Sequence, residues 1–177
     1  MVLRSKDGPL QVAFDPATQR ITDIGNRLHS QNDSAFLFTG IYLIDPVFFQ
    51  RIPPRTKISV IPIFLEMIKS GARLGGIVID EGHWWDLGTR EQYLAVHAFL
   101  GAHRHNSTWI DPTATVANDA KLSGAIAIAA RAEIGPRATL RDCIVWEDAR
   151  IAADSLLNEC VVTARAEVSG SHSRADL

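Results

Sequence analysis

The sequence has only two cysteines among its 177 residues, Cys143 and Cys160, and neither belongs to a Cys-x-x-Cys pair. Two isolated cysteines provide neither a disulfide framework nor a zinc site. No apolar run approaches the roughly 18 residues of a membrane span, and the N-terminus lacks the apolar core of a signal peptide. These absences argue against a disulfide-stapled secreted domain and against a membrane partner, and we expect a cytoplasmic protein.

A strong charge of either sign is also missing. The chain carries 18 Lys and Arg against 20 Asp and Glu, a net charge of -2, and its basic residues are scattered. Nucleic-acid binding normally needs a clustered basic surface, so we expect no nucleic-acid partner. A hydrophobic content of 46% indicates a globular chain of one compact domain or two small ones.

The strongest positive signal is a six-residue repeat that begins near Trp109. Aliphatic residues recur at Ile110, Val116, Leu122, Ile128, Ile134 and Leu140, and alanines follow four positions after most of them. This period is typical of a hexapeptide β-helix, in which each hexad forms one side of a triangular coil and three hexads complete the coil. We predict about three coils, left-handed like the hexapeptide-repeat family that this region resembles.

The repeat continues toward the C-terminus with one residue fewer per coil, so residues one coil apart should stack in columns. The predicted inward columns are Ile110, Ile128, Val145 and Val162; Val116, Ile134, Ile151 and Val168; and Leu122, Leu140 and Leu157. Ala125, Cys143 and Cys160 fall in one corner column, about 4.8 Å apart on adjacent rungs, as small buried fillers. Residues 169–177 lose the pattern and are predicted to form a polar tail.

The first hundred residues alternate short strands and helices. Turn residues and alternating apolar positions separate them. The predicted strands are 1–4, 10–14, 20–24, 35–44 and 74–79, and the predicted helices are 46–50, 62–70 and 89–103.

The segment from Gly82 to Tyr93 joins the last of these strands to the last helix. Asp86 lies in this turn, and Thr89 and Gln92 have the spacing of a capping box at a helix start. Asp86 is therefore expected at a rigid strand-to-helix junction, where ligands of phosphates and metals are common. The sequence His103-Arg104-His105 has no third ligand nearby, and we interpret it as a solvated linker.

Two motifs resemble a known family. Trp-Trp-Asp-Leu-Gly-Thr-Arg-Glu-Gln-Tyr-Leu, at residues 84–94, resembles a segment of sugar-1-phosphate nucleotidylyltransferases, and Phe38 to Leu43 resembles their Gly-hydrophobic-Tyr strand. Similarity to members that make GDP-mannose or act on glucose-1-phosphate implies an α/β fold. Residues 1–104 would form the C-terminal half of a Rossmann-like nucleotidyltransferase domain, and residues 105–177 the left-handed β-helix with its tail.

The resemblance also implies a reaction, in which a sugar-1-phosphate and a nucleoside triphosphate give a nucleotide sugar and pyrophosphate. Asp86 would be one of two aspartates that hold Mg²⁺, which prefers oxygen ligands. Gly40, Tyr42 and Trp85 would bind substrate. The family's glycine-rich phosphate loop and partner aspartate have no counterpart in residues 1–30, so we expect this chain to be part of such an enzyme, inactive alone and homo-oligomeric.

Two other functions fit the repeat. A non-catalytic assembly or regulatory module would stack its β-helix with further copies. A hexapeptide-repeat acyltransferase would use a histidine as general base in a cleft beside the coils. No histidine lies within residues 110–168, and one well inside the coils would favour the acyltransferase.

Overall fold

The computed structural model describes residues 1–30, 35–103 and 107–177. The chain forms two compact units, Met1–Trp84 and Trp85–Leu177. The predicted domain boundary at residue 104, and Arg104 and His105 of the His-Arg-His sequence, lie outside the described residues. No helix in the described part of the chain combines the length and the apolar character that crossing a bilayer requires.

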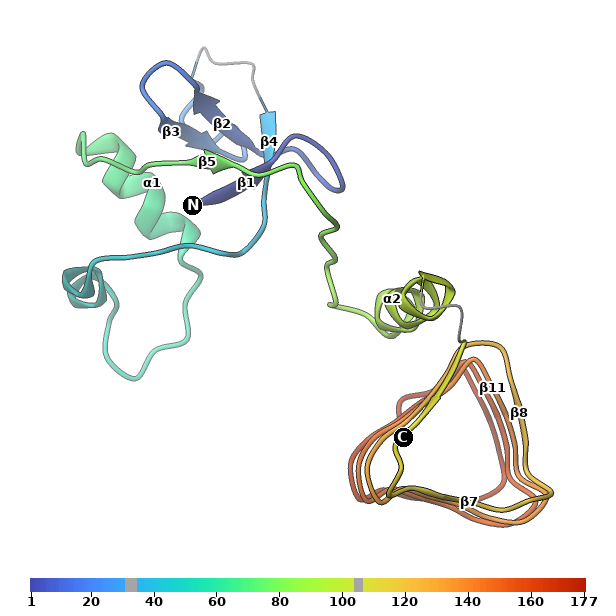
Figure 1. Cartoon of the computed structure of the whole chain (residues 1–177). Coiled ribbons are helices and arrows are strands. Elements are labelled where there is room, and N and C mark those ends of the chain that lie inside the picture. The colour runs from blue at the N-terminus through green and yellow to red at the C-terminus, as the bar shows by residue number, and fades with distance from the viewer. Residues whose placement is uncertain (31–34, 104–106) are drawn as a thin grey trace. The chain divides into compact units, whose positions relative to one another are not determined.

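The first unit is built on a mixed five-stranded sheet with the order β3-β2-β4-β1-β5 (Figure 1). Its strands are β1 (Val2–Arg4), β2 (Val12–Asp15), β3 (Arg20–Ile24), β4 (Ala35–Phe38) and β5 (Ile77–Val78). The helices of this unit are the 3-10 helix η1 (Pro46–Arg51) and α1 (Ile61–Lys69). Phe64 of α1 is buried in one apolar core with Leu3 and Val12 of the sheet, so α1 covers one sheet face.

This sheet differs from the predicted Rossmann-like layer. A doubly wound fold needs successive parallel strands joined by crossover helices. In the first unit β1 and β5 are parallel, but β2 pairs antiparallel with both β3 and β4, and β1 pairs antiparallel with β4. The described residues therefore show no Rossmann-like domain, and that part of the predicted fold class is not supported.

The predicted strand 35–44 is shorter in the structure for a local reason. β4 ends at Phe38, and the Thr39 hydroxyl donates a hydrogen bond to the Val2 carbonyl at 2.9 Å. Gly40 then has a φ of +81°, in the left-handed region, which an extended strand cannot contain. Asp45 caps the start of η1, because its carboxylate accepts a hydrogen bond from the Val47 amide at 2.9 Å.

The second unit is a left-handed β-helix of about four turns, seen as a triangle in Figure 1. Three four-stranded parallel sheets form its sides, in the orders β15-β12-β9-β6, β16-β13-β10-β7 and β17-β14-β11-β8. Their strands, in chain order, are β6 (Thr108–Ile110), β7 (Thr115–Val116), β8 (Lys121–Ser123), β9 (Ile126–Ile128), β10 (Glu133–Ile134), β11 (Thr139–Arg141), β12 (Ile144–Val145), β13 (Arg150–Ile151), β14 (Leu156–Asn158), β15 (Val161–Val162), β16 (Glu167–Val168) and β17 (Ser171–Ser173).

The register of these sheets confirms the three predicted aliphatic columns. Ile110 pairs with Ile128, and Val145 pairs with both Ile128 and Val162. Within this column the first-coil residue Ile110 is 39% exposed, whereas the other three are fully buried. The core therefore lies inside coils two to four, and the first coil forms its more open end.

The predicted polar tail is wrong, because the chain completes a fourth coil. β17 runs parallel to β14, and His172 takes the place of the next aliphatic residue after Leu157. The Leu177 amide then donates to the Val161 carbonyl at 2.9 Å. The step from Leu157 to His172 is 15 residues, not 17, and the new residue is polar, so the aliphatic period of the sequence does not extend into this coil.

Charged residues in the left-handed region turn the corners of the coils. Arg131 and Arg137 have φ values of +58° and +57°, and Asp148 and Asp154 occupy the same corners one coil later at +59° and +61°. Each arginine makes a two-point contact with the aspartate of the next coil, with Nε to Oδ1 at 2.7 Å in both pairs. These ladders align successive coils from the outside.

Helix α2 (Arg90–His103) packs on the outer side of one sheet. Tyr93 and Leu94 contact a small apolar cluster formed by Ala127, Ile144 and Val161. The predicted capping box is confirmed: the Gln92 amide donates to Thr89 Oγ1 at 3.2 Å, and the Thr89 amide donates to Gln92 Oε1 at 3.0 Å.

The columns predict that two leucines on neighbouring strands contribute very differently to the free energy of unfolding. Leu140 is fully buried in the coil interior, whereas Leu156 is 51% exposed. We expect Leu140→Ala to lower the free energy of unfolding by about 2–5 kcal/mol, through lost burial and the cavity left behind. Leu156→Ala should cost less than about 1 kcal/mol. Urea unfolding measures both, and equal losses would contradict the inward assignment.

The corner ladders predict an acid-sensitive component of stability. The hydrogen bond from Arg137 lowers the pKa of Asp154 below its usual 3.8. A carboxyl whose pKa falls on folding stabilises the fold above its unfolded pKa, and this stability is lost as the pH drops through the folded pKa. Arg137→Gln should therefore weaken the decline in urea midpoint between pH 6 and pH 3. The exposed Lys121→Gln variant is the control, and identical declines in all three proteins would refute the ladder's role.

Candidate functional site

A groove on the outside of the β-helix has His172 of the fourth coil among its lining residues, and the register places this histidine at the inward position that follows Leu157. This groove has a volume of about 360 Å³ and follows the sheet β17-β14-β11-β8. We call it the histidine groove; its lining residues are Thr139, Arg141, Leu156, Leu157, Asn158, Ser171, His172 and Ser173. They come from the last three coils, so the groove depends on the register that the inward columns set.

The His172 ring is held by one backbone contact. Its Nε2 lies 2.9 Å from the Ser169 carbonyl oxygen. Because a carbonyl can only accept, Nε2 must carry the hydrogen, and a neutral ring then presents an unprotonated Nδ1. Among the described residues Nδ1 has no hydrogen-bond partner. The contact with Ser169 holds the ring in place. Because His172 is half-buried at the end of an inward column, the ring is still accessible to solvent.

Two polar side chains accompany this histidine. Arg141 is exposed, and its Nε lies 3.5 Å from the Asp142 carboxylate, too far for a strong pair. The Asn158 side-chain amide donates to the Ser173 hydroxyl at 3.2 Å. Arg141 and Asn158 are outward residues of adjacent coils, whereas His172 continues the inward column of Leu140 and Leu157. The groove therefore offers a cation and an amide, and the histidine lies at the end of the coil interior on the strand that borders it.

The two cysteines occupy the predicted filler positions. Both are fully buried, and their Sγ atoms lie 3.1 Å and 3.3 Å from the carbonyl oxygens of Arg141 and Asn158. Burial raises the pKa of the Cys143 thiol to about 11, so this thiol is protonated at neutral pH. A buried, protonated thiol is a poor nucleophile, which suits a packing role.

The predicted metal ligand Asp86 lies exposed in its turn. No group of three or more His, Cys, Asp or Glu side chains suited to a metal occurs in the described part of the chain. A single exposed carboxylate does not fit a Mg²⁺ site, and we derive no step through this ion. Trp85 lies beside it in sequence and packs on Phe99, with ring centroids 5.3 Å apart.

The two other predicted substrate residues belong to the first unit. The Tyr42 ring packs against Phe38 and Phe64, at centroid distances of 5.8 Å and 5.5 Å, as part of the apolar core. Gly40 has open space where a side chain would be. Gly40 and Tyr42 thus lie in one unit and Trp85 and Asp86 in the other, and the substrate role of all four remains a prediction.

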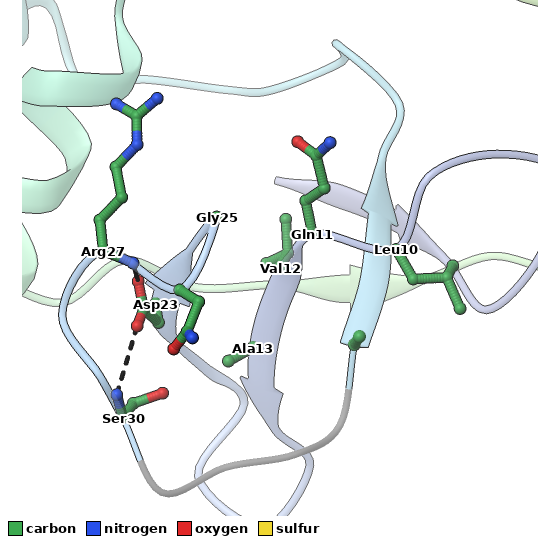
Figure 2. Close-up of a pocket in the computed structure, with 10 residues that line it drawn as sticks. Leu10, Gln11, Val12, Ala13, Asp23, Gly25, Arg27 and Ser30 are labelled. Atoms are coloured by element: carbon green, nitrogen blue, oxygen red, sulfur yellow. Dashed lines mark hydrogen bonds between the residues drawn. The ribbon is translucent and has the colours of Figure 1, made fainter.

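The first unit has a larger pocket of about 560 Å³, and Asp23 is one of the residues that line it (Figure 2). This aspartate belongs to none of the sequence motifs described above. Its buried carboxylate accepts backbone amides of the loop that follows, from Ile24 and Arg27 at 2.6 Å and 3.0 Å and from Leu28 and Ser30 at 3.0 Å and 3.2 Å. The carboxylate is occupied by the loop, so it holds the backbone in place and has little capacity left for a ligand.

This assignment predicts the effect of changing Asp23. Asp23→Ala removes the acceptor of four amides, and unpaired buried donors are costly, so we expect a loss of about 1–3 kcal/mol in stability of the first unit. Asp23→Asn keeps one acceptor oxygen and should lose less. Urea unfolding of both variants, with Asp45→Asn as an exposed control, measures the difference. An Asp23→Ala variant as stable as the parent would contradict this role.

Comparisons with known proteins find little similarity. No protein-family model matches the chain, and no curated protein sequence matches it. Among solved structures, a mutant of perosamine N-acetyltransferase from Caulobacter crescentus, in complex with CoA and GDP-perosamine, matches with 15% identity and a TM-score of 0.25. The match covers 64% of this chain and 69% of that one. The class that the structure itself defines is the left-handed β-helix.

These comparisons correct the function inferred from the two sequence motifs. Neither the family models nor the curated sequences return a sugar-1-phosphate nucleotidylyltransferase, and the described residues of the first unit lack the Rossmann-like layer that such an enzyme would have. The predicted function as part of such an enzyme is therefore contradicted, and a sugar-1-phosphate and a nucleoside triphosphate as partners are not supported. Of the resemblances drawn from the sequence, the β-helix is supported and the nucleotidyltransferase part is not.

Proposed function

We propose that the chain is an acyltransferase of the hexapeptide β-helix type, with His172 as its general base. One observation carries the proposal: the fourth coil places a half-buried histidine, with Nδ1 unpartnered among the described residues, at the end of the coil interior, on a strand that lines the groove. A histidine within the coils is the feature that separates this function from a purely structural repeat. The match to an acetyltransferase has too low a TM-score to add weight.

The proposed reaction moves an acyl group from a thioester to a hydroxyl or amino group. Nδ1 of neutral His172 takes the proton of the acceptor group as its oxygen or nitrogen attacks the thioester carbonyl. The new C–O or C–N bond forms, the C–S bond breaks, and the proton passes from the imidazolium to the leaving thiolate. Atoms and charge balance without a metal or a redox partner.

The remaining groove residues would hold the substrate. Arg141 is an exposed cation two rungs from His172 and is suited to a phosphate of either the acyl donor or a nucleotide-linked acceptor. Asn158 lies on the rung between them and can hydrogen-bond a sugar hydroxyl. The Ser169 carbonyl keeps the ring in the tautomer that accepts a proton at Nδ1.

Acyl transfer is tested by release of free thiol from acetyl-CoA, with GDP-perosamine as the first acceptor and a panel of amino sugars beside it. We expect acceptor-dependent thiol release that falls about 100-fold or more in His172→Gln, since general bases contribute about 10²–10⁴ in rate. Because both native cysteines are fully buried, they add little to a thiol-reagent signal.

His97→Gln is the matched control for this assay. His97 is also half-buried, on α2, where burial lowers its pKa. Its ring packs edge-to-face against Tyr93, with ring centroids 4.9 Å apart, and it does not line the groove. Its replacement should leave thiol release unchanged. Equal rates in the parent and His172→Gln, or no acceptor-dependent release with any acceptor of the panel, would overturn the proposed function.

A further inference from the structure

A second face of the β-helix carries a regular column of charges. It is the outer side of the sheet β16-β13-β10-β7, and we call it the charged face. It has a trough of about 700 Å³ and is separate from the sheet that α2 covers and from the histidine groove. The register places one outward residue per coil in this column, in the order Thr115, Glu133, Arg150 and Glu167.

The charges in this column are only loosely satisfied within the chain. Arg150 Nε lies 3.6 Å from Glu133 Oε1, and its Nη1 lies 3.8 Å from Glu167 Oε1. Both distances exceed hydrogen-bond length, whereas the corner pair of Arg131 and Asp148 closes to 2.7 Å. The Arg150 side chain is 61% exposed, so its guanidinium can engage a group outside the chain.

Small residues flank the charge column and let another backbone come close. They follow the inward residues of the same strands and are Ala117, Gly135, Ala152 and Ser169. Glycine is required at position 135 by the next coil of the same chain, because an added Cβ would lie 2.7 Å from the Ala153 amide nitrogen. The charged face is therefore a shallow trough with one raised row of charges along it.

The order of charges in this row makes it complementary to an identical row that runs in the opposite direction. Reading from the first coil it is polar, negative, positive, negative. If a second row runs in the opposite direction, Glu133 faces Arg150 of the other copy, Arg150 faces the other Glu133, and Thr115 faces Glu167 at both ends. A two-fold axis produces this arrangement, in which the same patch of each subunit contacts the other.

We propose that the charged face binds the charged face of a second copy of this chain, antiparallel and related by a two-fold axis. Opposite charges would alternate across the contact, which favours this register and disfavours the parallel one, where like charges meet. This inference uses a different face from the histidine groove and does not depend on the proposed acyl transfer. It gives a definite form to the predicted homo-oligomer.

Charge reversals test this contact in the full-length chain. Glu133→Arg should place two positive charges opposite each other in the dimer, and Arg150→Glu should place two negative charges there. We expect each variant alone to weaken dimerisation at least 10-fold, measured by sedimentation velocity as a shift from twice the 19.4 kDa chain mass toward the single mass. The double variant Glu133→Arg/Arg150→Glu restores both opposite pairs and should recover the dimer.

Mixing the two single variants separates this contact from effects inside one chain. In the mixture each position 133 meets an opposite charge at position 150 of the other variant, so a heterodimer should form although neither variant dimerises alone. Circular dichroism melting checks that both variants are folded. A monomeric parent, or single variants with the parent's mass, would overturn the proposal, and so would a mixture that stays monomeric.

Discussion

The structure of the second unit depends on one constraint, the stacking of each inward side chain on the residue one coil away. Parallel strands supply the hydrogen bonds between coils, but they alone do not fix the register, since a shift of one residue would turn every inward side chain outward. The columns that end in Val162 and Val168 penalise such a shift, because it would expose aliphatic surface and bury charged neighbours. The corners, the outer charge rows and the histidine groove take their positions from this register.

The same constraint explains why the charged residues lie on the outside of the β-helix. Each strand sends alternate residues outward, so a period that fixes the core also repeats the outer surface from coil to coil. At the corners this gives the contacts from Arg131 to Asp148 and from Arg137 to Asp154, and on the charged face it gives the row that includes Arg150. Where the core period breaks, at the step to His172, an inward position becomes polar and reachable from solvent.

The sequence was most informative where one rule repeats many times. Aliphatic periodicity predicted the coils from residue 110 to residue 168 and their columns, and Thr89 with Gln92 predicted the start of α2. The sequence was least informative where the pairing of strands decides the fold, as in the first unit, because the strand patterns there fit parallel and antiparallel pairing equally well.

The histidine groove could not be predicted, because His172 lies after a shortened step. A search for coils of unequal length is the signal that could have found it. The motif around Asp86 suggested a nucleotidylyltransferase that the comparisons contradict.

The central claim is that the chain from Ser169 to Leu177 is a structural coil that positions His172. Amide hydrogen exchange of the intact protein tests it most directly. The Arg174 and Leu177 amides donate to the carbonyls of Asn158 and Val161, each at 2.9 Å. We therefore predict that both exchange at least 100-fold more slowly than in an unstructured peptide. Exchange of these two amides at the unstructured rate, while Val145 stays protected, would contradict the fourth coil and with it the site.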